Sequence, residues 1–88
     1  MPLISQFYGI LIKMYFNEDC KHQKPHFHAK YGEYEASYDM NGKELVGKLP
    51  RKQHKLVTAW AIIHQEELIE LWKLIKETGE YFIIKGLE

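Results

Sequence analysis

Three histidines within a seven-residue stretch are the residues of this chain best suited to chemistry. His22, His26 and His28 stand close together, and Cys20 precedes His22 by two positions. An imidazole exchanges a proton near neutral pH, and imidazole and thiolate groups are common ligands of transition metals. The stretch therefore predicts proton transfer or metal binding as its chemistry.

Two of these histidines belong to a predicted strand and share one of its faces. Polar and apolar residues alternate from His26 to Tyr31, which is typical of a strand with one buried side. A two-residue turn at Gly32-Glu33 leads into a second strand, from Tyr34 to Met40. The register of this hairpin pairs three residues of each strand on the polar face: His26 with Asp39, His28 with Ser37, and Lys30 with Glu35.

The predicted register gives the polar face a catalytic interpretation. A carboxylate at Asp39 that accepts one ring N–H of His26 would raise the basicity of the other ring nitrogen. His26, His28, Asp39 and Ser37 are therefore the candidate catalytic residues, and this chemistry requires no cofactor. The alternative is a solvated cross-strand pair that contributes less than about 1 kcal/mol to stability.

A metal site is a competing interpretation of the same stretch. His22, His26 and His28, together with Asp39, are ligands that Zn²⁺ or another transition metal accepts. The spacing does not match the paired ligands of common zinc fingers or ribbons. Cys20 has no neighbour other than Lys21 and the histidines that would lower its pKa, so we do not predict a nucleophilic thiol.

A basic segment precedes a predicted helix and is a candidate phosphate site. Pro50 suits the first turn of a helix, but the residues that follow place positive charge at the positive end of the helix dipole. An anion would relieve that repulsion. The predicted phosphate or nucleic-acid contacts are Lys30, Lys48, Arg51 and Lys52. A solvated basic turn is the alternative.

The surrounding elements predict one α+β domain that spans residues 1–88. Alternation from Phe7 to Phe16 predicts a first strand, and the turn signal Asn41-Gly42 predicts a further hairpin, with Tyr38 opposite Leu45 and Asp39 opposite Glu44. We therefore expect an antiparallel meander of about four strands. One long or two consecutive helices follow on one face, and the tail adds an edge strand or docks on the sheet.

The helical segment runs from Pro50 to Thr78 and has two apolar sides. One stripe at helical spacing predicts the core: Val57, Ala61, His64, Leu68, Leu71, Trp72 and Ile75. Ile62 and Ile69 lie outside the stripe. Either the segment breaks near His64 into two helices, or it buries a second side in a homodimer or a partner. A non-enzymatic interaction module is therefore an alternative function.

Composition restricts the classes of protein that the chain can represent. With 12 basic and 12 acidic residues, its formal net charge is zero, so no global field attracts a polyanion. One cysteine among 88 residues cannot form an internal disulfide. The N-terminal segment has neither a secretion signal nor a span long enough for a membrane. We expect a cytoplasmic protein that does not contact membranes.

Several motifs resemble a small prokaryotic family described as domain of unknown function number 4160. They are Ile4 to Ile10, Met14-Tyr15, Pro25 to Ala29, Leu49 to Arg51, Trp60 to His64, Glu66 to Leu68, and Trp72. His22 matches a histidine of that family, whereas Lys24 stands where a second proline is usual and Cys20 has no regular counterpart. The resemblance implies a gene placed beside a second small gene, as in toxin–antitoxin modules.

The residues and the resemblance together lead to one functional hypothesis. The chain is expected to be a component of a toxin–antitoxin-type module that acts on or binds RNA through the histidine-rich strand face. Its expected partners are RNA, a cognate small protein from the neighbouring gene, or a second copy of itself. A homodimeric or partner-binding interaction module and a histidine-based metal-binding domain are the alternatives.

Overall fold

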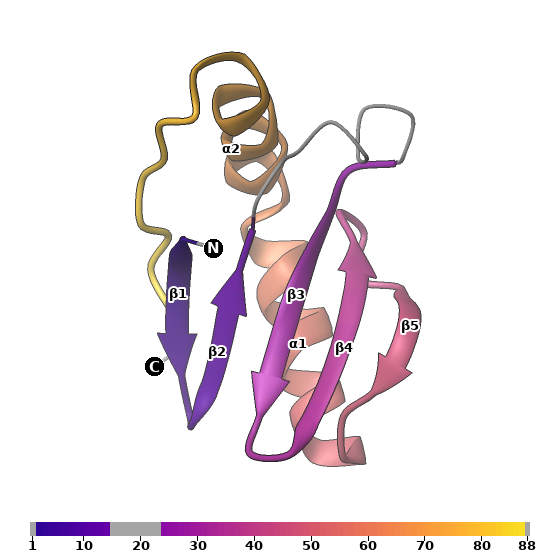
Figure 1. Ribbon diagram of the computed structural model, residues 1–88. Helices are drawn as coiled ribbons and strands as arrows, with labels where there is room; N and C mark the ends of the chain where they lie inside the picture. The colour runs from indigo at the N-terminus through magenta and orange to yellow at the C-terminus, as the bar shows by residue number, and fades with distance from the viewer. Residues whose placement is uncertain (1, 15–23, 88) are drawn as a thin grey trace.

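One antiparallel sheet with two helices behind it makes up the protein in the computed structural model, which describes residues 2–14 and 24–87 (Figure 1). The strands follow the order β1-β2-β3-β4-β5. Their bounds are β1 Leu3–Phe7, β2 Ile10–Lys13, β3 His26–Tyr31, β4 Tyr34–Asp39 and β5 Glu44–Lys48, followed by α1 Arg51–Ile63 and α2 Gln65–Thr78. The predicted α+β meander is confirmed, with five strands rather than about four.

The additional strand is β1, most of which precedes the stretch from Phe7 to Phe16 that was predicted as the first strand. That stretch turns at Tyr8-Gly9, so Phe7 ends β1 and Ile10–Lys13 forms β2. Both turn residues have positive φ, 47° at Tyr8 and 78° at Gly9. Two residues of this kind form the tight turn that joins antiparallel strands. A tyrosine is rare at positive φ, so the sequence does not predict the turn. Tyr15 and Phe16 lie outside the described residues.

The core lies between the sheet and the helices, and Trp60 of α1 stands at its centre. Its indole is fully buried and lies 5.4 Å from the ring of Phe7 and 5.6 Å from the ring of Phe27, between ring centroids. The predicted helical stripe is buried apart from His64, which is partly exposed. Burying apolar surface of this extent is the main stabilising term of such a fold.

The helical segment breaks at His64, as one of the two sequence interpretations predicted. His64 has φ −107° and ψ 24°, its N–H donates to the Trp60 carbonyl at 3.0 Å, and its own carbonyl accepts from Leu68 at 2.9 Å. The second helix ends at Gly79, which has φ 76°. A left-handed residue of this type is the common end of a helix. No helix within the described ranges has the length and apolar character needed to cross a bilayer.

The hairpin of β4 and β5 differs from its predicted register at the end nearest the turn. The Asp39 Oδ1 accepts hydrogen bonds from the N–H groups of Asn41 and Lys43, at 2.8 and 2.9 Å. These bonds enlarge the connection, so Tyr38 pairs with Glu44 and not with Leu45. The predicted pairing of Asp39 with Glu44 is wrong for the same reason. A bulge at Leu45 then restores the predicted pairing of Glu35 with Lys48.

The C-terminal tail docks along β1 and does not form a regular strand. The Ile84 N–H donates to the Ile4 carbonyl at 2.7 Å. The Trp60 Nε1–H donates to the Lys85 carbonyl at 2.9 Å, which ties the tail to α1. The tail passes beside β1 and ends near it (Figure 1). Of the two expectations for the tail, docking is the one that the structure shows.

A substitution at Gly47 tests how closely β5 approaches β4 next to the bulge. A Cβ at position 47 would lie 2.3 Å from the Glu35 carbonyl oxygen, and φ is 77°. We expect Gly47→Ala to lower the free energy of unfolding by at least about 3 kcal/mol, measured by urea denaturation. Gly32→Ala is the control, because its φ is 57° but no atom lies within 4 Å. It should cost only about 1–2 kcal/mol. Equal losses in both variants would contradict the close approach.

Candidate functional site

The candidate site is the face of the sheet that points away from α1. On β3, Phe27 packs against Trp60 of α1 and Ala29 is also buried, so the alternating residues His26, His28 and Lys30 belong to the side opposite α1. The two histidines are half-buried and Lys30 is exposed. The predicted strand thus separates its two faces as expected.

Residues of the neighbouring strands lie beside His26, His28 and Lys30 and form rows across the sheet. The β3–β4 register confirms the three predicted pairs: His26 with Asp39, His28 with Ser37, and Lys30 with Glu35. One row reads Lys13, His28, Ser37 and Val46, and the next reads Leu11, Lys30, Glu35 and Lys48. We call the outward residues of β2 to β5 in these rows, with His26 and Asp39, the outer face.

His26 is oriented by a main-chain carbonyl. Its Nδ1 lies 3.0 Å from the Lys24 carbonyl oxygen, so Nδ1–H donates and Nε2 is left as a proton acceptor. Its ring lies 5.2 Å from the ring of His28 and 5.3 Å from that of Trp72 on α2. The sequence assigned this orientation to Asp39, whose Oδ1 instead accepts the two hydrogen bonds of the β4–β5 turn.

His28 is more enclosed than its neighbour. Its Nε2 has almost no contact with solvent. Burial lowers the pKa of His28, the nearby His26 lowers it further, and the Glu35 carboxylate opposes both effects. A neutral imidazole is therefore the stable form of His28 at neutral pH. This geometry suits a residue that positions the ring of His26 better than one that releases a proton to solvent.

The predicted phosphate contacts divide into two groups. Lys30 and Lys48 lie on either side of Glu35 on the outer face, and both are exposed. Lys48 is two residues along β5 from the row of His28, a displacement of about 7 Å. Arg51 and Lys52 begin α1, at the end of the sheet opposite to the start of β3 (Figure 1). The structure therefore does not bring these two beside His26.

Lys13 is a residue of the outer face that sequence reasoning missed. It pairs directly with His28 across β2 and β3. Alternation in the first predicted strand already placed it on the face opposite Ile12 and Met14. The register between β2 and β3 depends on the segment from residue 15 to residue 23, whose length and composition give no pairing signal.

The metal interpretation depends on residues outside the described ranges. His22 and Cys20 both belong to the segment that the structure does not describe. Among residues 2–14 and 24–87, no three histidine, cysteine or acidic side chains gather closely enough to hold a metal ion. A site formed by His22 with His26 and His28 stays a prediction.

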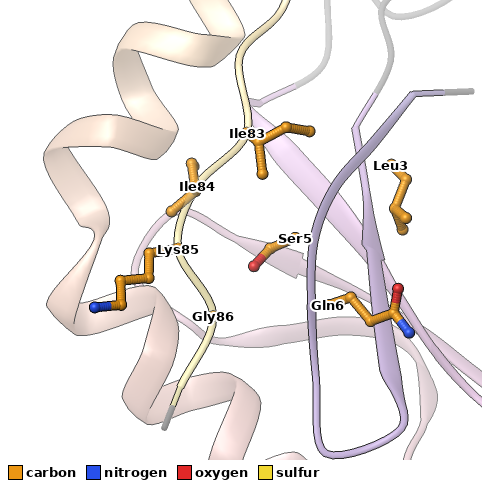
Figure 2. Close-up of a pocket in the computed structure, with 7 residues that line it drawn as sticks. All are labelled: Leu3, Ser5, Gln6, Ile83, Ile84, Lys85 and Gly86. Atoms are coloured by element: carbon orange, nitrogen blue, oxygen red, sulfur yellow. The ribbon is translucent and has the colours of Figure 1, made fainter.

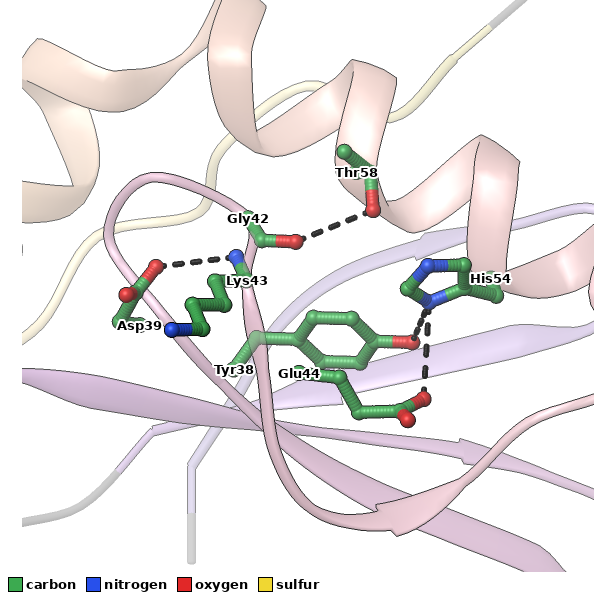
Figure 3. Close-up of polar contacts among 7 residues, drawn as sticks. All are labelled: Tyr38, Asp39, Gly42, Lys43, Glu44, His54 and Thr58. Atoms are coloured by element: carbon green, nitrogen blue, oxygen red, sulfur yellow. Dashed lines mark hydrogen bonds and ion pairs between the residues drawn. The ribbon is translucent and has the colours of Figure 1, made fainter.

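A second polar cluster, on the helix side of the sheet, was not predicted (Figure 3). The Tyr38 hydroxyl lies 2.9 Å from His54 Nδ1, and the Glu44 Oε2 lies 3.5 Å from the same nitrogen. The Tyr38 ring stacks between Phe27 and His54, with centroids 5.5 and 5.7 Å away. Glu44 reaches this side because of the enlarged β4–β5 turn. His54 lies three residues before Val57, so helical spacing could have identified it.

This cluster holds the first turns of α1 against the sheet. A neutral His54 Nδ1 accepts from the Tyr38 O–H, whereas a protonated one donates to Glu44. Burial and the Glu44 carboxylate raise the pKa of Tyr38, so its phenol keeps its proton over the usual range of pH. The Thr58 hydroxyl adds a hydrogen bond of 3.0 Å to the Gly42 carbonyl (Figure 3).

The lowered pKa of His28 predicts that acid destabilises the fold. Below about pH 6.5 the unfolded chain takes up a proton that folded His28 resists, so stability falls as the pH drops from 6.5 toward the folded pKa. We expect His28→Gln to reduce this slope in urea denaturation at a series of pH values. The same slope in the native protein and in His28→Gln would contradict the assignment.

The raised pKa of Tyr38 predicts a loss of stability in alkali. Above about pH 10 the phenol of the unfolded chain ionises while folded Tyr38 stays protonated, so stability falls as the pH rises toward the folded pKa. Tyr38→Phe should unfold more readily at neutral pH and show a weaker alkaline loss. Tyr34→Phe, at an exposed position, is the control. Unchanged alkaline behaviour of Tyr38→Phe would disprove the shift.

Comparison with known proteins identifies the family. The profile of the family described as Domain of unknown function (DUF4160) matches residues 9–73. The match begins in the β1–β2 turn and ends within α2, so it includes the whole outer face of β3 to β5. Searches of curated proteins and of solved structures gave no match. The resemblance inferred from the sequence motifs is therefore confirmed, and the chain belongs to the DUF4160 family.

Proposed function

We propose that this protein binds RNA across its outer face and that His26 acts there as a proton acceptor. The observation that carries the proposal is the arrangement around β3. His26, whose Nε2 is left as a proton acceptor, shares one face of β3 with His28 and Lys30. Lys13 lies on the adjacent strand β2, and Lys48 lies two strands away on β5. An RNA-acting component of a toxin–antitoxin-type module is the biological role that this proposal implies.

The charges of the outer face support binding by local contacts. Lys13, Lys30 and Lys48 come from three different strands. Glu35 lies between two of them, and Asp39 directs one carboxylate oxygen to its own turn. Because the whole chain has no net charge, affinity for RNA would come from these few lysines. The dependence of binding on salt would then be modest.

RNA cleavage would use the 2′-hydroxyl as nucleophile. His26 Nε2 would take the proton of that hydroxyl while its oxygen attacks the adjacent phosphorus. The bond to the 5′-oxygen then breaks, a cyclic phosphate forms, and the leaving oxygen takes a proton from solvent. Lys13 and Lys30 would stabilise the charge that develops on the phosphate. His28 and Ser37 are assigned a positioning role, since His28 Nε2 is shielded from solvent.

A paired set of variants tests RNA binding. We expect the double variant Lys30→Gln, Lys48→Gln to bind a fluorescent single-stranded RNA more weakly. The slope of the logarithm of the binding constant against the logarithm of the salt concentration should become less steep by about 1.4. The measurement is fluorescence anisotropy over a range of salt concentrations. Lys73→Gln with Lys76→Gln makes the same change of charge on α2 and should bind as the native protein does. Equal losses in both double variants would rule out the outer face.

Cleavage is tested separately from binding. His26→Gln should abolish cleavage of a short RNA and leave its binding, measured by anisotropy, unchanged, because the ring supplies a proton acceptor to the reaction and the lysines supply the phosphate contacts. His54→Gln, whose histidine lies on the helix side, should cleave normally. If native protein binds RNA without cleaving it, the catalytic role of His26 is wrong and the binding role remains. If it does not bind RNA at all, the whole proposal fails.

An interaction module is the second candidate, because isoleucines on the solvent-facing side of both helices are left uncovered. Ile62, Ile63 and Ile69 are 62%, 65% and 38% exposed. Exposed apolar groups of this size often mark a contact with another chain. A homodimer through this side predicts that Ile62→Asp lowers the mass measured by light scattering at high concentration. A monomeric native protein under those conditions would dismiss this candidate.

A further inference from the structure

A cavity lies between β1 and the C-terminal tail, away from the outer face (Figure 2). It is open to solvent on one side, has a volume of ≈ 300 Å³, and is lined by Leu3, Ser5 and Gln6 of β1 and by residues 83–86 of the tail. This volume is at the lower end of the range of small-molecule pockets, about 300–1,000 Å³. A ligand the size of a single ring would therefore fill it.

The walls of this cavity are held in place at several points. The Ile84 N–H donates to the Ile4 carbonyl, and the Lys85 carbonyl accepts from the Trp60 indole. At Gly86 the tail touches β1 so closely that a Cβ there would lie 2.6 Å from the Gln6 carbonyl oxygen. The cavity is thus bounded by hydrogen bonds and by backbone contact.

Ser5 gives the cavity a specific chemical feature. Its side chain is directed from β1 toward the tail (Figure 2), and the residue is 3% exposed. Its hydroxyl has no hydrogen-bond partner among the described residues. A buried hydroxyl without a partner is unfavourable, and a ligand that offers a donor or an acceptor would remove that cost. Because the Ser5 Oγ itself has almost no contact with solvent, the tail must shift slightly to admit that group. Ser5 lies beside the irregular pairing at the start of β1, which explains why Ile4 and Ser5 are both buried.

The lining determines the class of ligand. Leu3 and Ile83 supply apolar surface, and Lys85 is the charged residue of the lining. The Lys85 ammonium extends away from β1 (Figure 2), so the charged residue of the lining does not point at the Ser5 hydroxyl. We propose that this cavity binds a small neutral molecule that has a compact apolar body and one hydroxyl or carbonyl group, which forms a hydrogen bond with Ser5 Oγ.

Cyclohexanol is a suitable probe for this site. Titration into ¹⁵N-labelled protein should give saturable changes of amide chemical shift confined to Leu3–Phe7 and residues 83–87, with a Kd in about the millimolar range. Ile83→Trp places a large side chain over the cavity at a position that is 65% exposed, and it should abolish these changes. A cavity that holds only water, with no saturable shift, would overturn the proposal. Shifts that Ile83→Trp leaves unaltered would do the same.

Ser5→Ala isolates the hydrogen bond. We expect the affinity for cyclohexanol to fall by about threefold to tenfold, while the affinity for benzene is kept or increased. Ser37→Ala, a serine of the outer face, should leave both affinities unchanged. An unaltered affinity for cyclohexanol in Ser5→Ala, or an equal loss for both probes, would refute the role of Ser5. Should circular dichroism show that Ser5→Ala does not fold, the Ile83→Trp titration decides the proposal.

Discussion

The burial of Trp60 is the constraint on which the other parts of the structure depend. Its indole touches aromatic rings of β1 and β3, and it lies 5.7 Å from the ring of His64 at the helix break. Its N–H also holds the C-terminal tail. One side chain therefore positions the sheet edge, the sheet centre, the junction of the two helices and the tail. Because β3 turns Phe27 toward this indole, alternation directs its histidines to the opposite face.

Local sequence patterns were sufficient to predict the elements that pair with a segment adjacent in the sequence. The hairpin of β3 and β4 has a short turn at Gly32-Glu33, so its register followed directly from alternation. The helical stripe followed from spacing of 3.6 residues per turn, and a break near His64 was one of the two alternatives that this spacing left open. The Tyr8-Gly9 turn could not be predicted, because a tyrosine at positive φ contradicts the usual preference. Packing of the flanking strands outweighs that local cost.

The candidate site was predictable in composition and only partly in geometry. The predicted pairing of His26 and His28 with residues of β4 was correct, because it depends only on the position of one short turn. The hydrogen bonds of Asp39 were not foreseen, because a side chain that bonds the N–H groups of its own turn competes with cross-strand contacts. Glu44 escaped notice for the same reason, because the altered turn moves it to the helix side. His54 was missed although its helical spacing from Val57 was available in the sequence. Arg51 and Lys52 are separated from His26 by the length of the sheet, which no local pattern reports.

The enlarged β4–β5 turn and the bulge at Leu45 compensate for one another. The turn adds a residue on one side of the hairpin, and the bulge absorbs it before the pair of Ser37 with Val46. The tip of this hairpin is thus mechanically independent of the strands below it. Changes of length at the tip need not propagate to the rows that carry the histidines, so the loop is free to diversify among relatives while the face beneath keeps its alignment.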